Sequence, residues 1–219
     1  MELLEILKIT MLTRSIGILT IGTGFILYRR GHLIHPWTFF YLLLMLLGEI
    51  LSAALPYWGF SNFLILTSSG FLHFAFLIHL FSREFFKLSH PLLLAIIVLG
   101  LIPIVAHYAM GWDGTPKQSY QRGIYDFMTC FLGLFGFLLI MQDTSKADRA
   151  SLWLIGSVLL FFVLDTVWSL GTQYLIHGQK WVVYSFWIFR GLCLQNLYLS
   201  IIHYLWKSGK THKRPSFGY

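Results

Sequence analysis

The sequence predicts an all-α integral membrane protein, a bundle of seven transmembrane helices with the N-terminus outside and the C-terminus in the cytoplasm. Of its 219 residues, 57% are hydrophobic and only 11% are charged, whereas an ordinary soluble domain carries about 25% charged residues. Because so few charged side chains cannot cover a soluble body of this size, lipid has to cover the rest. We therefore expect a multi-pass protein of the bacterial inner (cytoplasmic) membrane.

Seven apolar segments follow one another along the chain. Each has about 19 or more residues, enough at about 1.5 Å per residue to cross a hydrocarbon core of about 30 Å. Residues 1–207 are therefore expected to form one transmembrane domain, followed by a basic cytoplasmic tail at 208–219. The predicted spans are 9–28, 36–56, 61–82, 91–109, 120–141, 151–173 and 182–206.

Turn residues mark the breaks between these spans. Arg29-Arg30-Gly31 lies between the first two spans, and Ser89-His90-Pro91 introduces the fourth. The run Trp-Asp-Gly-Thr-Pro at 112–116 precedes the fifth span, and sequences of this kind are typical of turns and loops. No break is long enough to hold a soluble domain, so the chain is predicted to form a single bundle.

The distribution of lysine and arginine predicts the orientation of the bundle. Ten of these residues fall on the side of the C-terminal tail and four on the opposite side. Since short cytoplasmic loops carry an excess of positive charge, the tail is expected inside, where it can contact anionic lipid. No nucleic acid partner is expected. The ten are Arg29, Arg30, Arg83, Lys87, Lys146, Arg149, Lys207, Lys210, Lys213 and Arg214; the four are Lys8, Lys117, Arg122 and Lys180.

Charged residues within the spans give the candidate site. Charge is costly in a bilayer and usually faces the bundle interior. Asp165 and Arg190 each lie eight residues from the outer ends of adjoining spans, about 12 Å deep, so an ion pair between these neighbouring helices is expected. Apart from Arg122, which is counted with the outer side, the charged residues in the spans all fall in the outer half of the membrane: Arg14, Glu49, Asp126, Asp165 and Arg190.

We predict that these charges line a polar, ligand-binding pocket that opens outward. Trp168 and Ser169 follow Asp165 by three and four residues and therefore share its helix face. The alternative is a set of ion pairs that fix the helix register and bind nothing. A second stripe, Asn196, Ser200 and His203, is expected to hydrogen bond neighbouring helices. The predicted ligand-binding residues are Glu49, Asp126, Asp165, Trp168, Ser169, Arg190 and Arg14.

No cofactor, metal or catalytic residue is predicted. His73 and His79 are six residues apart, about 120° off a common helix face, and His107 lies at another depth, which disfavours a bis-histidine haem. A retinal Schiff base needs a lysine amine, whereas the last span contains Arg190 and no lysine. The sequence also lacks His-x-x-x-His and Gly-x-Ser-x-Gly motifs, which are typical of metal and serine-nucleophile sites.

The expected function is that of a membrane sensor, receptor-like protein or membrane-complex subunit. In topology alone the chain resembles the seven-helix input modules of bacterial sensor kinases. We expect it to signal or assemble through a separate protein partner, at the cytoplasmic face or within the membrane. One alternative is a small-solute or proton-coupled transporter, for which Gly100 and Pro103 in the fourth span are relevant. A third is a lipid-modifying membrane enzyme that uses the intramembrane carboxylates as acid or base.

Overall fold

The protein is all-α in the residues that the structure, a computed structural model, describes: 3–32, 36–58, 63–109, 119–142, 148–176 and 180–212. The predicted last span, 182–206, is part of a longer helix, which runs from Lys180 to His212 and is labelled α8. A 3-10 turn (η1, Leu55–Trp58) follows α2, and a π-helical turn (η2, Ser82–Phe86) follows α3. The α-helices are α1 (Leu3–Arg29), α2 (Pro36–Ala54), α3 (Phe63–Phe81), α4 (His90–Leu99), α5 (Ile102–Ala109), α6 (Ser119–Gln142), α7 (Arg149–Ile176) and α8 (Lys180–His212).

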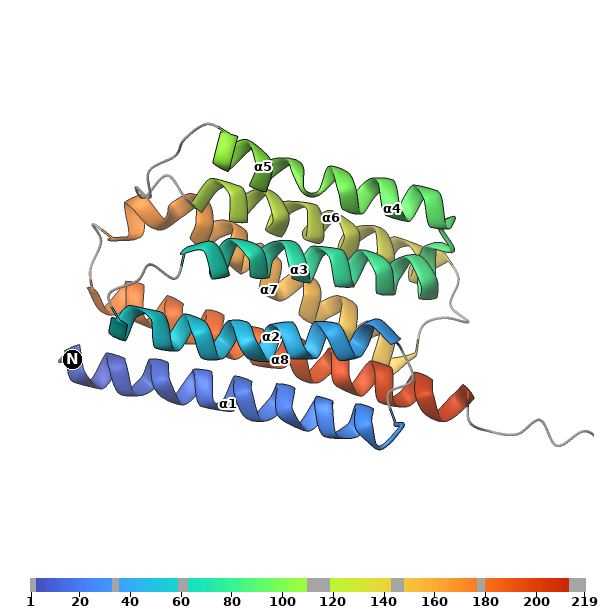
Figure 1. Cartoon of the computed structure of the whole chain (residues 1–219), viewed down its shortest axis with the longest axis horizontal. Coiled ribbons are helices and arrows are strands. Elements are labelled where there is room, and N and C mark those ends of the chain that lie inside the picture. Colours follow the sequence, from blue (N-terminus) through green and yellow to red (C-terminus); the bar gives the residue numbers. More distant parts are fainter. Residues whose placement is uncertain are drawn as a thin grey trace, which may run out of the picture.

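The helices lie along the long axis of the molecule and alternate in direction (Figure 1). Six of them form a closed ring in the order α1, α2, α3, α6, α7, α8, in which each helix packs against the next and α8 packs against α1. The remaining two, α4 and α5, follow one another end to end and lie outside the ring against α3 and α6 (Figure 1). Each of the seven apolar segments is thus helical in its described part, and the fourth is broken.

Pro103 and Gly100 explain the break between α4 and α5. Proline has no backbone N–H, so the Leu99 carbonyl, four residues earlier, loses its usual helical partner. The Leu101 N–H bonds instead to the Val98 carbonyl at 3.0 Å, which tightens the turn. From α6, the buried Tyr125 hydroxyl donates a hydrogen bond to the Gly100 carbonyl at 2.8 Å, so a side chain of the ring ties the broken helix to it.

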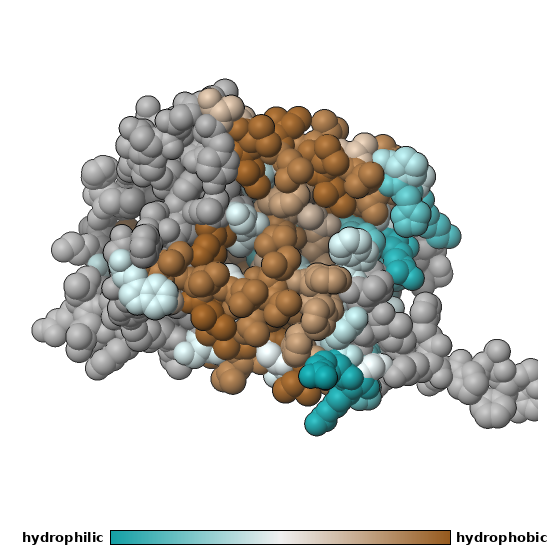
Figure 2. Space-filling view, viewed as in Figure 1, coloured by the Kyte–Doolittle hydropathy of each residue, from teal (hydrophilic) through white to brown (hydrophobic). Residues whose placement is uncertain are grey.

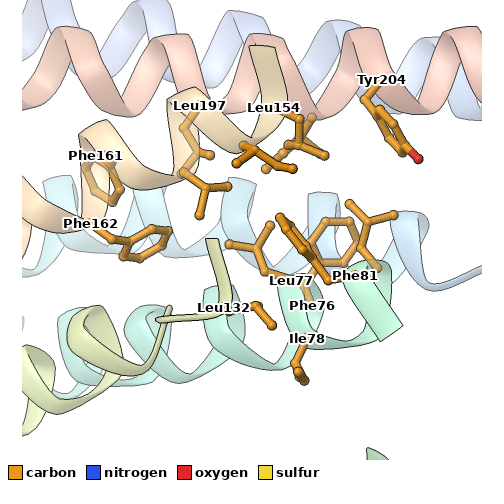
Figure 3. Packing of buried hydrophobic residues seen from close by; sticks show 14 of the residues in the cluster. Phe76, Leu77, Ile78, Phe81, Leu132, Leu154, Phe161, Phe162, Leu197 and Tyr204 are labelled. Carbon is orange, nitrogen blue, oxygen red and sulfur yellow. The ribbon is translucent and has the colours of Figure 1, made fainter. Parts of the chain in front are cut away.

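Large apolar side chains fill the interior of the ring. Leu77 and Phe81 of α3 face Leu154 of α7 and Leu197 of α8, and all four are buried (Figure 3). Gly136 lets α6 approach this cluster closely, because a Cβ there would lie 2.7 Å from Cε1 of Phe81. The core therefore joins α3, α6, α7 and α8 into one packed unit.

The outer surface is also apolar. Figure 2 shows hydrophobic residues across the middle of one face and hydrophilic residues at the end where α1, α3 and α8 end. Two helices, Gly123–Gln142 and Arg149–Gly171, are long and apolar enough to cross a membrane. The outward side of α6 alone exposes Ile124, Phe127, Phe131, Leu134, Phe135, Leu138 and Met141.

Candidate functional site

An ion pair between α7 and α8 is the centre of the candidate site. Nε of Arg190 donates a hydrogen bond to Oδ1 of Asp165, and the Asp165 side chain is 0% exposed. The pair forms because α7 and α8 are antiparallel neighbours and the two residues lie at the same height. The equal depths counted from the sequence therefore brought the correct partners together.

Arg190 is the accessible member of this pair. Its side chain is 15% exposed, and its guanidinium carbon lies 5.5 Å from the centre of the Phe161 ring, an attractive cation–π geometry. A guanidinium has five N–H donors. Among the described residues, Asp165 accepts from Nε, and the terminal nitrogens of Arg190 have no recorded hydrogen bond.

A second buried carboxylate lies one helical turn away. Asp126 of α6 accepts a hydrogen bond from the Ser169 hydroxyl at 3.2 Å, and both side chains are buried. Ser169 is four residues after Asp165 on α7, so the two carboxylates occupy consecutive turns of the same interface. Gly123 of α6 lies beside this contact, and a Cβ there would meet Cβ of Ser169 at an ordinary van der Waals distance of 3.5 Å.

Trp168 forms an aromatic wall beside these polar groups. Its ring stacks on Phe186 of α8, with centroids 5.6 Å apart and planes 16° from parallel, and it also lies 6.3 Å from the Trp187 ring. Trp168 is only partly buried. The cluster of Asp126, Asp165, Trp168, Ser169 and Arg190, named the outer polar cluster below, therefore combines charge, hydroxyl and aromatic surface.

Glu49 lies apart from the outer polar cluster. The Tyr198 hydroxyl of α8 donates to Oε1 of Glu49 at 3.4 Å. Tyr198 is eight residues beyond Arg190 on the same helix, which is a rise of about 12 Å. Arg14 lies outside the described side chains.

Polar contacts continue along α7 and α8 toward the inner end. Nδ2 of Asn196 donates to the Ser157 hydroxyl at 2.7 Å, and Nε1 of Trp153 donates to the Asn196 carbonyl oxygen at 3.1 Å. The predicted role of Asn196 in helix packing agrees with these bonds. Beyond them, Nζ of Lys207 donates to Oδ2 of Asp148 at 2.8 Å.

Asp148 also caps α7, because its Oδ1 accepts the Ser151 backbone N–H at 2.7 Å. Partial burial alone would raise the pKa of this carboxyl, but the hydrogen bonds from Lys207 and Ser151 outweigh it and hold the pKa below its ordinary value. From the sequence, Lys207 is expected to orient the bundle and to belong to a basic segment that can bind anionic lipid, and Asp148 is not identified as its partner. An acidic residue three positions before Ser151 at a helix start is the capping signal that could have found it.

Some predicted features fall outside the described side chains. They include His107 and the tail beyond His212. Of the lysines and arginines that predict the orientation, the side chains that the structure describes all belong to the predicted inner end: Arg29, Arg30, Arg83, Lys87, Arg149 and Lys207. The side chains that fall outside the description are those of Lys146, Lys210, Lys213 and Arg214 on the predicted inner side and of Lys8, Lys117, Arg122 and Lys180 on the predicted outer side.

The chemistry available to the outer polar cluster is ionic and hydrogen bonding. Within the described part of the chain, no group of three or more histidine, cysteine, aspartate or glutamate side chains is arranged to hold a metal ion. A partly exposed guanidinium beside an aromatic wall suits the recognition of an anion. No protein family model, curated protein or solved structure matches the chain.

Proposed function

We propose that the chain is a seven-helix protein of the bacterial inner membrane, with its N-terminus outside and its C-terminus in the cytoplasm. The distribution of apolar side chains supports this proposal. Large hydrophobic residues are exposed on α1, α2, α4, α5, α6, α7 and α8, as Leu19, Phe40, Leu94, Val105, Phe131, Val163 and Phe189 illustrate. A monomeric soluble protein rarely exposes apolar patches of more than a few hundred Å², whereas lipid covers such a surface without cost.

Within that membrane protein, we propose that the outer polar cluster senses a small anion, a carboxylate or phosphate. The observation that carries this proposal is the state of Arg190. Asp165 fixes the guanidinium through Nε, while its terminal nitrogens have no recorded bond to a described residue and the side chain is partly exposed. An anion can therefore bind Arg190 without displacing Asp165, which avoids leaving a buried carboxylate without its cation.

The α7–α8 pair offers a route from this cluster to the inner end. Polar contacts join the two helices at Asp165–Arg190, at Ser157–Asn196 and at Asp148–Lys207. A change in the distance between Asp165 and Arg190 would therefore shift α7 relative to α8, and the other ends of these two helices lie among basic residues. We propose that a separate protein partner reads that end, while anionic lipid binds the basic tail.

Binding is tested with the protein reconstituted in lipid nanodiscs and titrated with acetate, succinate and inorganic phosphate. Tryptophan fluorescence is a suitable signal because Trp168 lies in the cluster. At least one anion should give a saturable change in the wild type and in Asp165→Asn, which retains the guanidinium. The double variant Asp165→Asn/Arg190→Gln, which removes both charges together, should lose the response.

Lys207→Gln is the matched control, because it removes a cation from the same helix at the other end. Its titration should match the wild type. An unaltered response in the double variant, or no saturable response to any of the three anions in the wild type, would overturn the proposed site.

A transporter is the second candidate, favoured by the break between α4 and α5. Discontinuous helices occur at the binding sites of many secondary transporters. Here the broken helix lies outside the ring of six, against α3 and α6. Gradient-driven uptake of the bound anion into sealed vesicles would favour transport, whereas copurification of a stable partner without uptake would favour the sensor.

A further inference from the structure

A second polar centre lies in the middle of the ring, around His73 of α3. The histidine is buried, and aromatic rings from three other helices surround it. Tyr198 of α8 is nearly parallel to it at 5.9 Å, and Tyr41 of α2 and Phe162 of α7 approach edge-on, each at 5.9 Å between ring centres. Phe161 of α7 completes the enclosure at 6.4 Å.

The backbone fixes which nitrogen of His73 can accept a proton. Nδ1 lies 2.7 Å from the Ser69 carbonyl oxygen. A carbonyl oxygen only accepts hydrogen bonds, so Nδ1 carries the hydrogen, and the lone pair of the neutral ring is on Nε2. Protonation at Nε2 gives an imidazolium that keeps the bond to Ser69.

Two buried hydroxyls of α2 are suited to bind internal water near this centre. The side chains of Thr38 and Tyr41 are 0% and 4% exposed, and neither hydroxyl has a hydrogen-bond partner among the residues that the structure describes. Buried polar groups of this kind are usually satisfied by internal water. Thr38, Tyr41 and Glu49 share one face of α2 over about 16 Å, with the apolar Met45 between Tyr41 and Glu49.

The charges around His73 act in opposing directions. Glu49 of α2 reaches the centre through Tyr198, whose hydroxyl it binds at 3.4 Å, and its carboxylate favours a cation on the histidine. Arg190 of α8 opposes that cation from beyond the Phe161 ring, and the negative charge of its ion-pair partner, Asp165 of α7, offsets this effect. Among the described residues, Tyr41 and Tyr198 are the titratable groups whose rings contact His73. From α6, Asp126 lies against Ser169 instead. The ring faces of the aromatic residues also favour a cation.

From this arrangement we propose that His73 is a proton-binding site, at which Nε2 takes a proton from internal water held beside the Tyr41 and Thr38 hydroxyls. The proton comes from hydronium in the bulk solvent and is relayed through this water, so no hydroxide remains in the site, and return of the proton from Nε2 to the solvent restores the neutral ring. The site is distinct from the outer polar cluster and does not depend on anion binding.

The test is ¹⁵N NMR of histidine-labelled protein in nanodiscs between pH 5 and 9. The chain has nine histidines, so His73 is assigned as the signal missing from His73→Gln. If that variant does not fold, contact with labelled Tyr198 provides the assignment. We expect the Nδ1–H form at high pH and a change to the doubly protonated ring between about pH 8 and pH 5.

Two glutamates provide a matched comparison, because each accepts a hydrogen bond from a tyrosine of α8. Glu49→Gln should lower the titration midpoint of His73, since it removes the carboxylate that contacts Tyr198 beside the histidine. Glu84→Gln, which loses the bond from Tyr204 at the inner end, should leave the midpoint unchanged. A neutral Nδ1–H ring throughout the pH range, or equal effects of the two glutamate variants, would overturn the proposal.

Discussion

At the scale of single residues, Asp165 and Arg190 make each other's burial possible. The carboxylate is fully enclosed, and moving an ion out of water costs several kcal/mol even after the protein relaxes. The charged hydrogen bond from Arg190 and the attraction of the Phe161 ring for the guanidinium offset that cost. The pair therefore matters for stability mainly because removing one partner alone leaves the other charge buried without compensation.

Single and double substitutions should reveal this dependence. Asp165→Asn or Arg190→Gln alone should lower the free energy of unfolding by about 3–5 kcal/mol, because each leaves one buried charge uncompensated. The double variant should lose less than either single variant. A double-mutant cycle on reversible unfolding in bicelles measures the difference; additive losses would show that the two charges do not stabilise each other.

Asp148 and Lys207 give a smaller, pH-dependent contribution at the inner end. The pKa of Asp148 is lower in the folded protein than in the unfolded chain, where it is about 3.9. Folding therefore favours the ionised carboxylate. The stabilisation is therefore complete above that value and is lost as the pH falls through the folded pKa. Both side chains are nearly half exposed, which limits the contribution to about 1 kcal/mol.

The corresponding test compares Asp148→Asn with the wild type. The wild type should be the more stable protein at pH 6 in low salt, and the difference should shrink at pH 3. The free energies of unfolding at the two pH values provide the measurement. A difference that does not change with pH would rule out ionisation of Asp148 as its cause.

Residue-scale prediction succeeded where two charges belong to sequence-adjacent helices. Asp165 and Arg190 could be matched by depth because the short connection makes their helices antiparallel neighbours. Glu49 could not be matched in the same way, because its partner Tyr198 lies on a helix far along the chain. The Phe161 contact with Arg190 depends on the rotation of α7 and α8 about their axes, which a count of residues does not provide.

At the scale of helices, glycine sets how closely the elements pack. A Cβ at Gly136 of α6 would lie 2.7 Å from the rigid Phe81 ring and 3.4 Å from Ile155, whereas a Cβ at Gly156 of α7 would meet nothing within 4 Å. Gly136→Ala should therefore destabilise the protein by about 1–3 kcal/mol. Gly156→Ala should be neutral or slightly stabilising, since alanine is the better helix former. Equal thermal stability of the two variants would contradict this packing.

The break in the fourth segment depends on a contact from another helix. Tyr125→Phe removes the hydroxyl that binds the Gly100 carbonyl while keeping the ring, and should cost about 1 kcal/mol or more because the bond is buried. Hydrogen exchange should increase at the amides of residues 100–106 more than in α7. Unchanged exchange around the break would mean that Tyr125 does not hold α5 in place.

Helix positions were predictable from the sequence, and their ends less so. Gly100 and Pro103 identified the irregular fourth segment because they act locally. The last helix runs from Lys180 to His212, beyond the apolar span 182–206, because hydropathy ends where lysines begin whereas the helical backbone continues through polar residues.

At the scale of the whole molecule, the packing of helices that are joined by short connections could be predicted from the sequence. The closure of the ring could not. Packing of α1 on α8 and of α3 on α6 joins segments distant in sequence, and α4 and α5 remain outside. These choices depend on side-chain shape, as at Gly24, where a Cβ would lie 2.8 Å from Cδ1 of Ile202. The apolar character of α6 and α7, which are long and apolar enough to cross a membrane, was predictable because it requires only that apolar residues predominate.

The central claim is that an anion at Arg190 changes the inner end of the bundle. Spin labels at Lys87→Cys and Arg149→Cys, both exposed residues there, leave the Asp148–Lys207 contact intact. They report the distance between the start of α7 and the end of η2 by double electron–electron resonance, after Cys130 and Cys193 are replaced by alanine. Whichever of acetate, succinate and phosphate binds most tightly should shift this distance, and the Asp165→Asn/Arg190→Gln background should abolish the shift. An identical distance distribution with and without saturating anion, in protein that binds it, would contradict the account.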